Sequence, residues 1–294
     1  MHLAPRVLRR AVAGLTVALL ATAVGCAPQP EEKAAATPSG SAGNACAQGK
    51  LATKTSGKLT IATDTPAYEP WFKDDKPANG EGFESAVAYA VAERLGYDKS
   101  AVVWQSVPFN KAFAPGEKSF DFDINQVSIS DERKKAVDFS SGYYDVRQAV
   151  IALKGSKAAK VTGIAGLKGL KLGAQVGTTS LDYIDDVVKP TRAAAVFAKN
   201  DQAKSALKNG QVDAIVTDLP TAFYITAAEV TDGTIVGQFE NQGGTPEQFG
   251  LVLDKGSALT PCVTAAVDAL RANGALARIE QQWLSDAVDA PVLK

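Results

Sequence analysis

Apolar positions follow two different periods along this chain. Phe120, Phe122 and Ile124 alternate with polar residues, which is the two-residue period of a β-strand. Apolar residues of 83–95 instead recur at the three-to-four-residue spacing of a helix, and Gly96 follows as a stop signal. The same signals predict strands at 59–63, 102–107, 170–176, 212–218, 235–239 and 249–253, and helices after 179 and at 203–210, 260–270 and 276–283. Because strands and helices alternate twice over, the sequence predicts an α/β architecture with mostly parallel sheets.

The segment 122–133 places a charged side chain where a strand gives way to a helix. Ser130 is a candidate N-cap, Asp131 and Glu132 suit the first helical turn, and Arg133 follows near the helix start. Free backbone N–H groups, the positive helix end and a fork-shaped guanidinium together attract a carboxylate. The alternative is an ordinary strand-to-helix turn with a solvated arginine.

Polar groups also follow other predicted strands. Asp64, Thr178 with Thr179, and Asp218 come directly after strands, as the segment 128–133 does. Ligands of parallel α/β sheets bind beyond the carboxyl ends of the strands, so these groups are expected to form one ligand site. The alternatives are local: simple helix capping for the two threonines, and an N-cap for Asp218.

Composition excludes several function classes. The only histidine is His2, inside the expected signal segment, which excludes Ser-His-Asp and Cys-His catalysis and histidine metal sites in the mature chain. Formal net charge is -1, and removing three leader arginines gives -1 - 3 = -4. A net negative chain argues against nucleic acid as a partner.

The N-terminus carries the features of an export signal. Three arginines within 6–10 precede an apolar run at 11–24, which is too short for a helix that spans a bilayer of ~30 Å. We therefore expect a signal peptide at 1–25. Residues 23–26 resemble the bacterial lipobox, which implies lipidation of Cys26 and a lipid anchor at the outer face of the cell membrane. A plain secretory signal is the alternative.

A polar segment separates the signal from the rest of the chain. Residues 26–57 are expected to form a flexible tether, because most of them are Ala, Pro, Gly, Ser or charged residues without an apolar period. The remaining residues suffice for two small domains. Cys46 and Cys262 are expected to form a disulfide, since two cysteines of an exported chain pair more often than they bind metal.

Several motifs, in order along 58–283, together resemble solute-binding protein family 3, the amino-acid receptors of ABC importers. They are Ala62-Thr63-Asp64-Thr65, Gly82-Phe83-Glu84, the segment 128–133 with Val137-Asp138-Phe139-Ser140, Leu167-Lys168-Gly169 before Gly177-Thr178-Thr179, and Gly210 to Ala214 before Asp218. Two departures are Ser85 to Ala88 in the first helix, and Asn125 and Gln126 in place of smaller residues.

The resemblance implies a two-lobed, type II periplasmic-binding-protein fold in which each lobe is a mostly parallel sheet flanked by helices. Lobe 1 is expected at 58–145 and 241–294, and lobe 2 at 146–240. The chain would then cross between lobes twice, near Asp145 and Glu240, and two crossing strands form a hinge.

The resemblance also implies a role for each candidate ligand residue. Arg133, helped by Ser128, is expected to bind an α-carboxylate, with Thr178 and Thr179 contributing from the facing lobe. Asp218 is expected to accept the α-ammonium group.

The side-chain end of the site has its own candidates. Tyr68 and Phe109 are expected to form its walls, and Trp71 is a weaker candidate. Asp64 is expected to contact a distal polar group, and Asn125 and Gln126 keep the pocket polar. A polar or cationic amino acid is therefore expected, because an aliphatic one would leave these groups unpaired and a cation could face an aromatic ring.

The expected partners are an amino acid and the permease subunits of an ABC importer, for a monomeric protein without cofactor, metal or catalytic residues. Two alternatives are a dehydratase-like enzyme acting on a small carboxylate, with Asp64 or Asp218 as acid or base, and a ligand-sensing domain.

Overall fold

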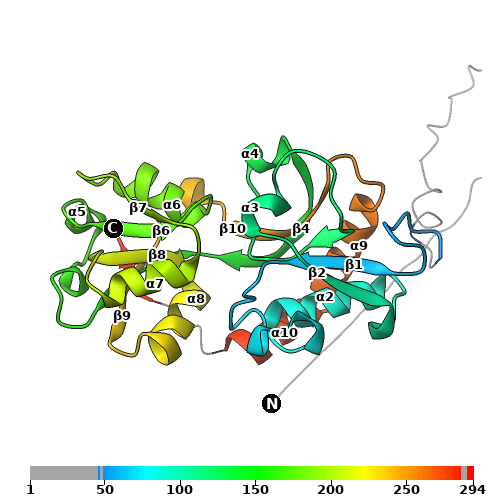
Figure 1. Ribbon diagram of the computed structural model, residues 1–294, viewed down its shortest axis with the longest axis horizontal. Helices are drawn as coiled ribbons and strands as arrows, with labels where there is room; N and C mark the ends of the chain where they lie inside the picture. The colour runs from blue at the N-terminus through cyan, green and yellow to red at the C-terminus, as the bar shows by residue number, and fades with distance from the viewer. Residues whose placement is uncertain (1–45, 47–48, 286–289) are drawn as a thin grey trace, which may run out of the picture. The chain divides into compact units, whose positions relative to one another are not determined.

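The computed structural model describes residue 46 and residues 49–285 and 290–294 (Figure 1). The expected signal peptide at 1–25, the lipidation site Cys26 and the tether up to residue 45 lie outside the described residues. Within the described part of the chain, no helix combines the length and apolar character needed to cross a membrane.

The first sheet has five strands in the order β2-β1-β3-β10-β4. The strands are β1 (Leu59–Thr63), β2 (Val102–Ser106), β3 (Phe122–Asp123), β4 (Val137–Val146) and β10 (Glu247–Asp254). Strand β1 runs parallel to β2 and β3, and β10 runs antiparallel to β3 and β4. Every residue of β1 is buried, as its central position in the sheet requires.

The α-helices of lobe 1 are α2 (Phe83–Arg94), α3 (Phe109–Ala112), α4 (Asp131–Lys134), α9 (Thr260–Ala272) and α10 (Ala275–Leu284). Of these, α2, α9 and α10 contribute to the main apolar core. Helices α2, α9 and α10 contact one another, and they lie along the same side of the sheet in Figure 1. Helix α2 buries Phe83, Val87 and Val91 there, the positions whose helical spacing predicted it.

The second sheet has six strands in the order β11-β9-β5-β8-β6-β7. The strands are β5 (Gln148–Leu153), β6 (Leu172–Gln175), β7 (Ala195–Phe197), β8 (Ala214–Asp218), β9 (Gly233–Phe239) and β11 (Val292–Leu293). Its α-helices are α5 (Ile164–Leu167), α6 (Thr179–Asp182), α7 (Asn200–Lys208) and α8 (Leu219–Tyr224), and π-helices follow two of them at Tyr183–Val188 and Ile225–Glu229. Short 3-10 helices lie at Lys73–Asp75, Pro77–Asn79, Lys99–Ala101, Ala158–Lys160 and Gln242–Gly244.

The two-sheet α/β architecture confirms the expected fold class, but the sheets are mixed rather than mostly parallel. Among the described strands, two of four pairings in the first sheet and three of five in the second are parallel. The antiparallel pairings all involve β10 or β5. These strands adjoin the crossings at 146–148 and 239–247. Strand β4 leaves the first sheet and β10 re-enters it at the same end, with Glu247 opposite Val146, so the two strands run antiparallel.

The C-terminal residues differ from the expected lobe boundary. Residues 241–294 were all expected in lobe 1, but β11 pairs in parallel with β9 of the second sheet. Leu293 is 2% exposed, and the carbonyl oxygen of Lys294 accepts a 3.1 Å hydrogen bond from the Ile164 amide. Burying Leu293 and pairing the edge of β9 stabilises this third crossing, which the apolar pattern of two residues was too short to reveal.

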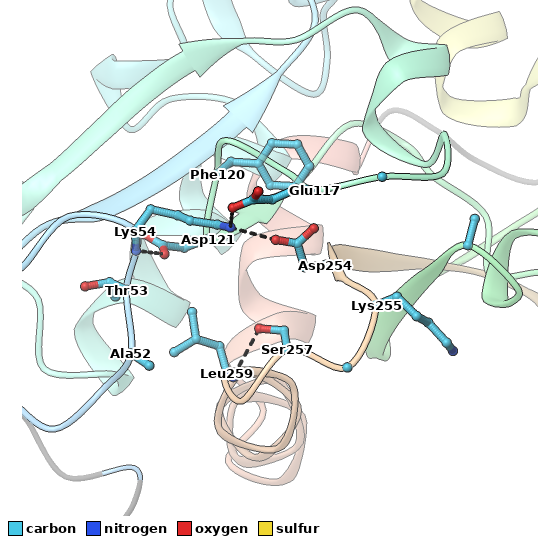
Figure 2. A pocket seen from close by; sticks show the side chains of 13 residues that line it. Ala52, Thr53, Lys54, Glu117, Phe120, Asp121, Asp254, Lys255, Ser257 and Leu259 are labelled. Carbon is cyan, nitrogen blue, oxygen red and sulfur yellow. Dashed lines mark hydrogen bonds and ion pairs between the residues drawn. The ribbon is translucent and has the colours of Figure 1, made fainter.

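The end of the expected tether lies on lobe 1 rather than free. The Lys54 amide donates to Asp121 Oδ1 at 2.7 Å, and Lys54 Nζ donates to Asp254 Oδ2 at 2.7 Å. Figure 2 shows these contacts at the edge of a surface cavity of about 510 Å³, where Glu117 also approaches Lys54. The structure also contains the expected Cys46–Cys262 disulfide, with Cα atoms 5.4 Å apart.

Candidate functional site

A small cavity brings together side chains from both sheets. Nine of the ten expected ligand residues line it, and Ser128 is the exception. Its lining residues are Asp64, Tyr68, Phe109, Asn125, Gln126, Arg133, Gln175, Thr178, Thr179, Ser180, Asn200 and Asp218. The cavity measures about 30 Å³, well below the ~300–1,000 Å³ typical of ligand pockets.

Arg133 is positioned by the turn that the sequence predicted. Ser130 caps α4, because its Oγ accepts a hydrogen bond from the Arg133 amide at 3.2 Å. The guanidinium is 4.4 Å from the Phe113 ring centroid and donates to the carbonyl oxygens of Ser128 and Gly177, at 2.6 and 2.9 Å. Arg133 is only 9% exposed, so the alternative of a solvated arginine is wrong.

The chemistry of Arg133 follows from this burial. Burial lowers the pKa of Arg133, and the carboxylates of Asp182, Glu247 and Asp218 oppose that shift. A buried guanidinium that touches one lobe through Ser128 and the other through Gly177 suits a carboxylate bound between them.

The hydroxyls of Ser128 and Thr179 converge on Glu247, a residue that the sequence did not single out. Ser128 Oγ donates to Glu247 Oε1 at 2.5 Å, and Thr179 Oγ1 donates to the same oxygen at 2.6 Å. The two hydroxyls are themselves 3.3 Å apart. A carboxylate therefore already lies between the two hydroxyl donors expected to bind a ligand carboxylate.

Thr178 caps a helix, which was the alternative to ligand binding for this residue. Its Oγ1 accepts from the Leu181 amide at 3.2 Å and donates to the Gln175 carbonyl oxygen at 2.8 Å. The hydroxyl thus caps α6, and Thr178 also borders the cavity.

The pKa of the Asp218 carboxyl group is raised in this cavity, which bears on ligand binding. Burial raises the pKa of Asp218 to about 7, and the nearby Glu247 carboxylate adds to the effect. Gln148 opposes it, because its Nε2 donates to Asp218 Oδ1 at 2.8 Å. Asp218 precedes α8 but makes no side-chain capping bond, so its carboxylate is not used as an N-cap.

Asp64, Tyr68 and Asn125 form the far end of the cavity. Asp64 Oδ2 accepts from the Phe109 amide at 3.3 Å, and its Oδ1 lies 3.8 Å from Lys199 Nζ. Asn125 Nδ2 is buried and has no hydrogen-bond partner among the described residues. This end is polar, as expected, and it includes cations that the sequence did not predict.

Gln126 lines the cavity as expected, but its donors are used elsewhere, and the expectation for Trp71 needs correction. Gln126 has a φ of 49°, and both its amide and its side-chain Nε2 donate to the Glu84 carboxylate, so these donors point to the core. Burial raises the pKa of Glu84 to about 7. Trp71 is fully buried rather than a ligand wall, and its Nε1 donates to Thr221 Oγ1 of α8 at 2.8 Å. Large aromatic side chains are more often part of the core than of a ligand site.

The sequence analysis did not identify some further residues of the site. Two of them could have been identified because they lie at the end of a strand or the start of a helix. Gln175 ends β6 and Asn200 begins α7, so both lie at strand or helix ends facing the site, and Gln175 Oε1 accepts from the Asn200 amide at 2.9 Å. Gln148, which hydrogen-bonds the lining residues Asp218 and Ser180, had no such signal, because it begins a strand. Among the described residues, no group of three or more His, Cys, Asp or Glu side chains could hold a metal ion.

Comparison with known proteins agrees with this geometry. The chain is 29% identical to the ABC transporter glutamine-binding protein GlnH of Bacillus subtilis (strain 168) over 254 residues, which cover 84% of this chain and 90% of that protein. It is 28% identical to the L-arginine-binding protein of Pseudomonas aeruginosa over 250 residues, covering 81% and 95%.

A solved structure of an ancestral arginine-binding protein bound to arginine superposes with a TM-score of 0.65 at 31% identity, covering 77% of this chain and 98% of that one. The two-lobed fold expected from the sequence is thereby confirmed. Residues 59–286 match the profile of the bacterial extracellular solute-binding proteins, family 3, and the chain belongs to that family.

Proposed function

We propose that this protein is the extracytoplasmic receptor of an ABC importer and binds an α-amino acid between its two lobes. The observation that carries the proposal is the meeting of Arg133 and Asp218 in one cavity lined by both sheets. A guanidinium and a carboxylate in a shielded cleft match the two charges of a zwitterionic α-amino acid. Membership of a family of solute-binding proteins favours this role over the dehydratase-like alternative.

Arg133 would hold the α-carboxylate and Asp218 the α-ammonium. The ammonium group would stabilise the ionised form of Asp218 and so lower its pKa from about 7. Arg133 already makes hydrogen bonds to carbonyl oxygens in both lobes, so a bound carboxylate would replace contacts that now link Ser128 and Gly177.

Entry of a ligand requires the lobes to separate, since a cavity of about 30 Å³ cannot contain an amino acid. The contacts to be broken include the hydrogen bonds from Arg133 to Gly177 and from Trp71 to Thr221. Rotation about the crossings at 146–148 and 239–247 would open and close the cleft, the usual motion of two domains joined by crossing strands.

Export and anchoring complete the proposal. Residues 1–25 would be the signal peptide and Cys26 the lipidated N-terminus, which would tether a monomeric receptor to the outer face of the membrane near its permease. Replacing Cys26 by alanine should release the protein from membranes or block its maturation. Cell fractionation followed by immunoblotting measures this, and an unchanged membrane-bound fraction would contradict lipidation.

Thermal unfolding of the purified protein in the presence of each of the twenty amino acids tests the binding function. A specific ligand at 100 times its Kd should stabilise the protein by about 2.7 kcal/mol and raise its Tm. Isothermal calorimetry should then give one site per chain. If none of the amino acids shifts the Tm or releases heat, the proposed function is wrong.

A further inference from the structure

The sequence favours a cationic ligand because of Asp64, Tyr68 and Phe109. In the structure, a positively charged side chain of the protein itself lies near each of these three residues. The Asp64 carboxylate lies 3.8 Å from Lys199 Nζ. The Tyr68 ring has Lys204 Nζ at 5.3 Å from its centroid, and the Phe109 ring has the Arg133 guanidinium at 5.8 Å. The attractions that would recruit a ligand cation are therefore already used within the protein.

Lys199 reaches Asp64 from the opposite lobe. It precedes α7 of lobe 2, and its Nζ also donates a hydrogen bond to the Thr65 carbonyl oxygen of lobe 1. The Asp64 side chain is 14% exposed and that of Lys199 is 42% exposed, so the pair lies at the rim of the cavity. A ligand ammonium or guanidinium at Asp64 would have to displace Lys199 or be repelled by it.

Lys204 is fixed more firmly than Lys199. Its Nζ forms ion pairs with Glu229 Oε1 at 2.6 Å and with Asp201 Oδ1 at 2.8 Å, and its side chain is only 10% exposed. A lysine held by two carboxylates stays over the Tyr68 ring. The face of Tyr68 that Lys204 covers is therefore not available to a cation of the ligand.

The amide nitrogen of Asn125 needs a hydrogen-bond acceptor. Asn125 is 7% exposed, and its Nδ2 has no partner among the described residues. An amide nitrogen only donates, so Asn125 Nδ2 is satisfied only by an acceptor atom. Guanidinium and ammonium groups contain no acceptor and would leave this buried donor unpaired.

We infer that the site selects amino acids with a neutral terminal amide over cationic ones, and that Lys199 is a specificity-determining residue. A terminal amide oxygen accepts from Asn125 Nδ2, while the amide nitrogen donates to Asp64 beside Lys199. A terminal carboxylate lacks that donor and would face Asp64 with like charge. The inference rests on the proposed amino-acid binding and narrows it to glutamine and related amides.

Calorimetric titration with glutamine, arginine and glutamate tests the inference on the wild type and on Lys199→Ala. We expect wild type to bind glutamine at least tenfold more tightly than arginine or glutamate. Removing Lys199 frees Asp64 for a ligand cation, so the ratio of arginine to glutamine affinity should rise about fivefold, the size of one partly exposed charge interaction. Lys208→Ala is the matched control, because Lys208 is an exposed lysine at the other end of α7, which Lys199 precedes, and does not line the cavity.

A double variant separates charge from shape. In Lys199→Ala combined with Asp64→Asn, the gain for arginine should disappear, because no carboxylate remains to attract the cation. Tighter binding of arginine than glutamine by wild type, or an arginine-to-glutamine ratio that Lys199→Ala leaves unchanged, would overturn the inference while leaving amino-acid binding intact. Absence of binding by every amino acid would instead overturn the proposed function together with this inference.

Discussion

The Ser128 hydroxyl donates a 2.5 Å hydrogen bond to Oε1 of Glu247, a residue 119 positions away in the sequence. Thr179 of the other lobe donates to the same oxygen. Glu247 therefore joins the lobes through the hydroxyls that the family resemblance assigns to a ligand carboxylate. In the proposed binding cycle, the Glu247 side chain competes with the ligand for these donors.

Replacing Glu247 by glutamine should tighten amino-acid binding roughly three- to tenfold. The change removes a negative charge near the expected α-carboxylate and weakens the hydrogen bonds that the ligand must displace, since hydrogen bonds to charged groups exceed neutral ones by about 1 kcal/mol. Calorimetry measures the effect, with Glu132→Gln on the exposed face of α4 as the control. Weaker binding by Glu247→Gln would mean that Glu247 supports the ligand instead.

Replacing Arg133 by alanine should abolish detectable amino-acid binding. A carboxylate left without its buried cation loses about 2–5 kcal/mol of binding free energy. Arg133→Lys should also weaken binding, because an ammonium group cannot reproduce the two-pronged guanidinium geometry seen at Ser128 and Gly177. Circular dichroism and Tm show whether each variant is folded. A folded Arg133→Ala protein with wild-type affinity would refute the assignment of the α-carboxylate.

Ligand affinity should fall as the pH decreases from about 7.5 to 5. The pKa of Asp218 is about 7 in the ligand-free protein, and a bound ammonium group favours the ionised carboxylate. Below pH 7 the ligand must therefore displace a proton, which lowers the affinity by up to about tenfold per pH unit. Calorimetry in buffers of different ionisation enthalpy should detect the released proton. In Asp218→Asn the affinity should be low and its pH dependence flat; an unchanged slope would exclude Asp218 as its source.

Stability of the ligand-free protein should also decrease with rising pH. Glu84 and Asp218 both have a folded-state pKa of about 7, above the ordinary values of 4.5 and 3.8. The folded protein keeps protons that the unfolded chain releases, so the free energy of unfolding falls as the pH rises from about 4 through 7. Scanning calorimetry between pH 5 and 8 should show a declining Tm. A Tm that rises through this range would contradict the raised pKa values.

Loss of the Cys46–Cys262 disulfide should lower the thermal stability without abolishing ligand binding. The bridge closes a loop with a sequence separation of 216, and loop-closure entropy limits its contribution to about 5 kcal/mol. Reduction of the wild type should lower the Tm, and the double variant Cys46→Ser/Cys262→Ser should have a low Tm that reductant does not change. Equal Tm values for the oxidised wild type and the double variant would show that the bridge does not stabilise the fold.

Local sequence patterns predicted much of the fold and the backbone position of several site residues. The helical spacing of Phe83, Val87 and Val91 identified α2, because a helix that covers a sheet must bury one face. Asp64 and Asp218 could be placed at strand ends because strand periodicity stops there, and Arg133 could be placed near a helix start because Ser130 suits an N-cap. These patterns depend only on residues that are close together in the sequence, within one helix or strand.

Tertiary structure alone decided which partners each side chain has. Lys199 meets Asp64 and Thr65 across the lobes, and Glu247 meets Ser128 and Thr179, through contacts between residues far apart in the sequence. Gln126 lies at a strand end like the others, yet the buried Glu84 carboxylate takes its donors. The sequence determines which groups reach the cleft, whereas long-range packing and the need to pair buried charges determine which of them remain free for a ligand.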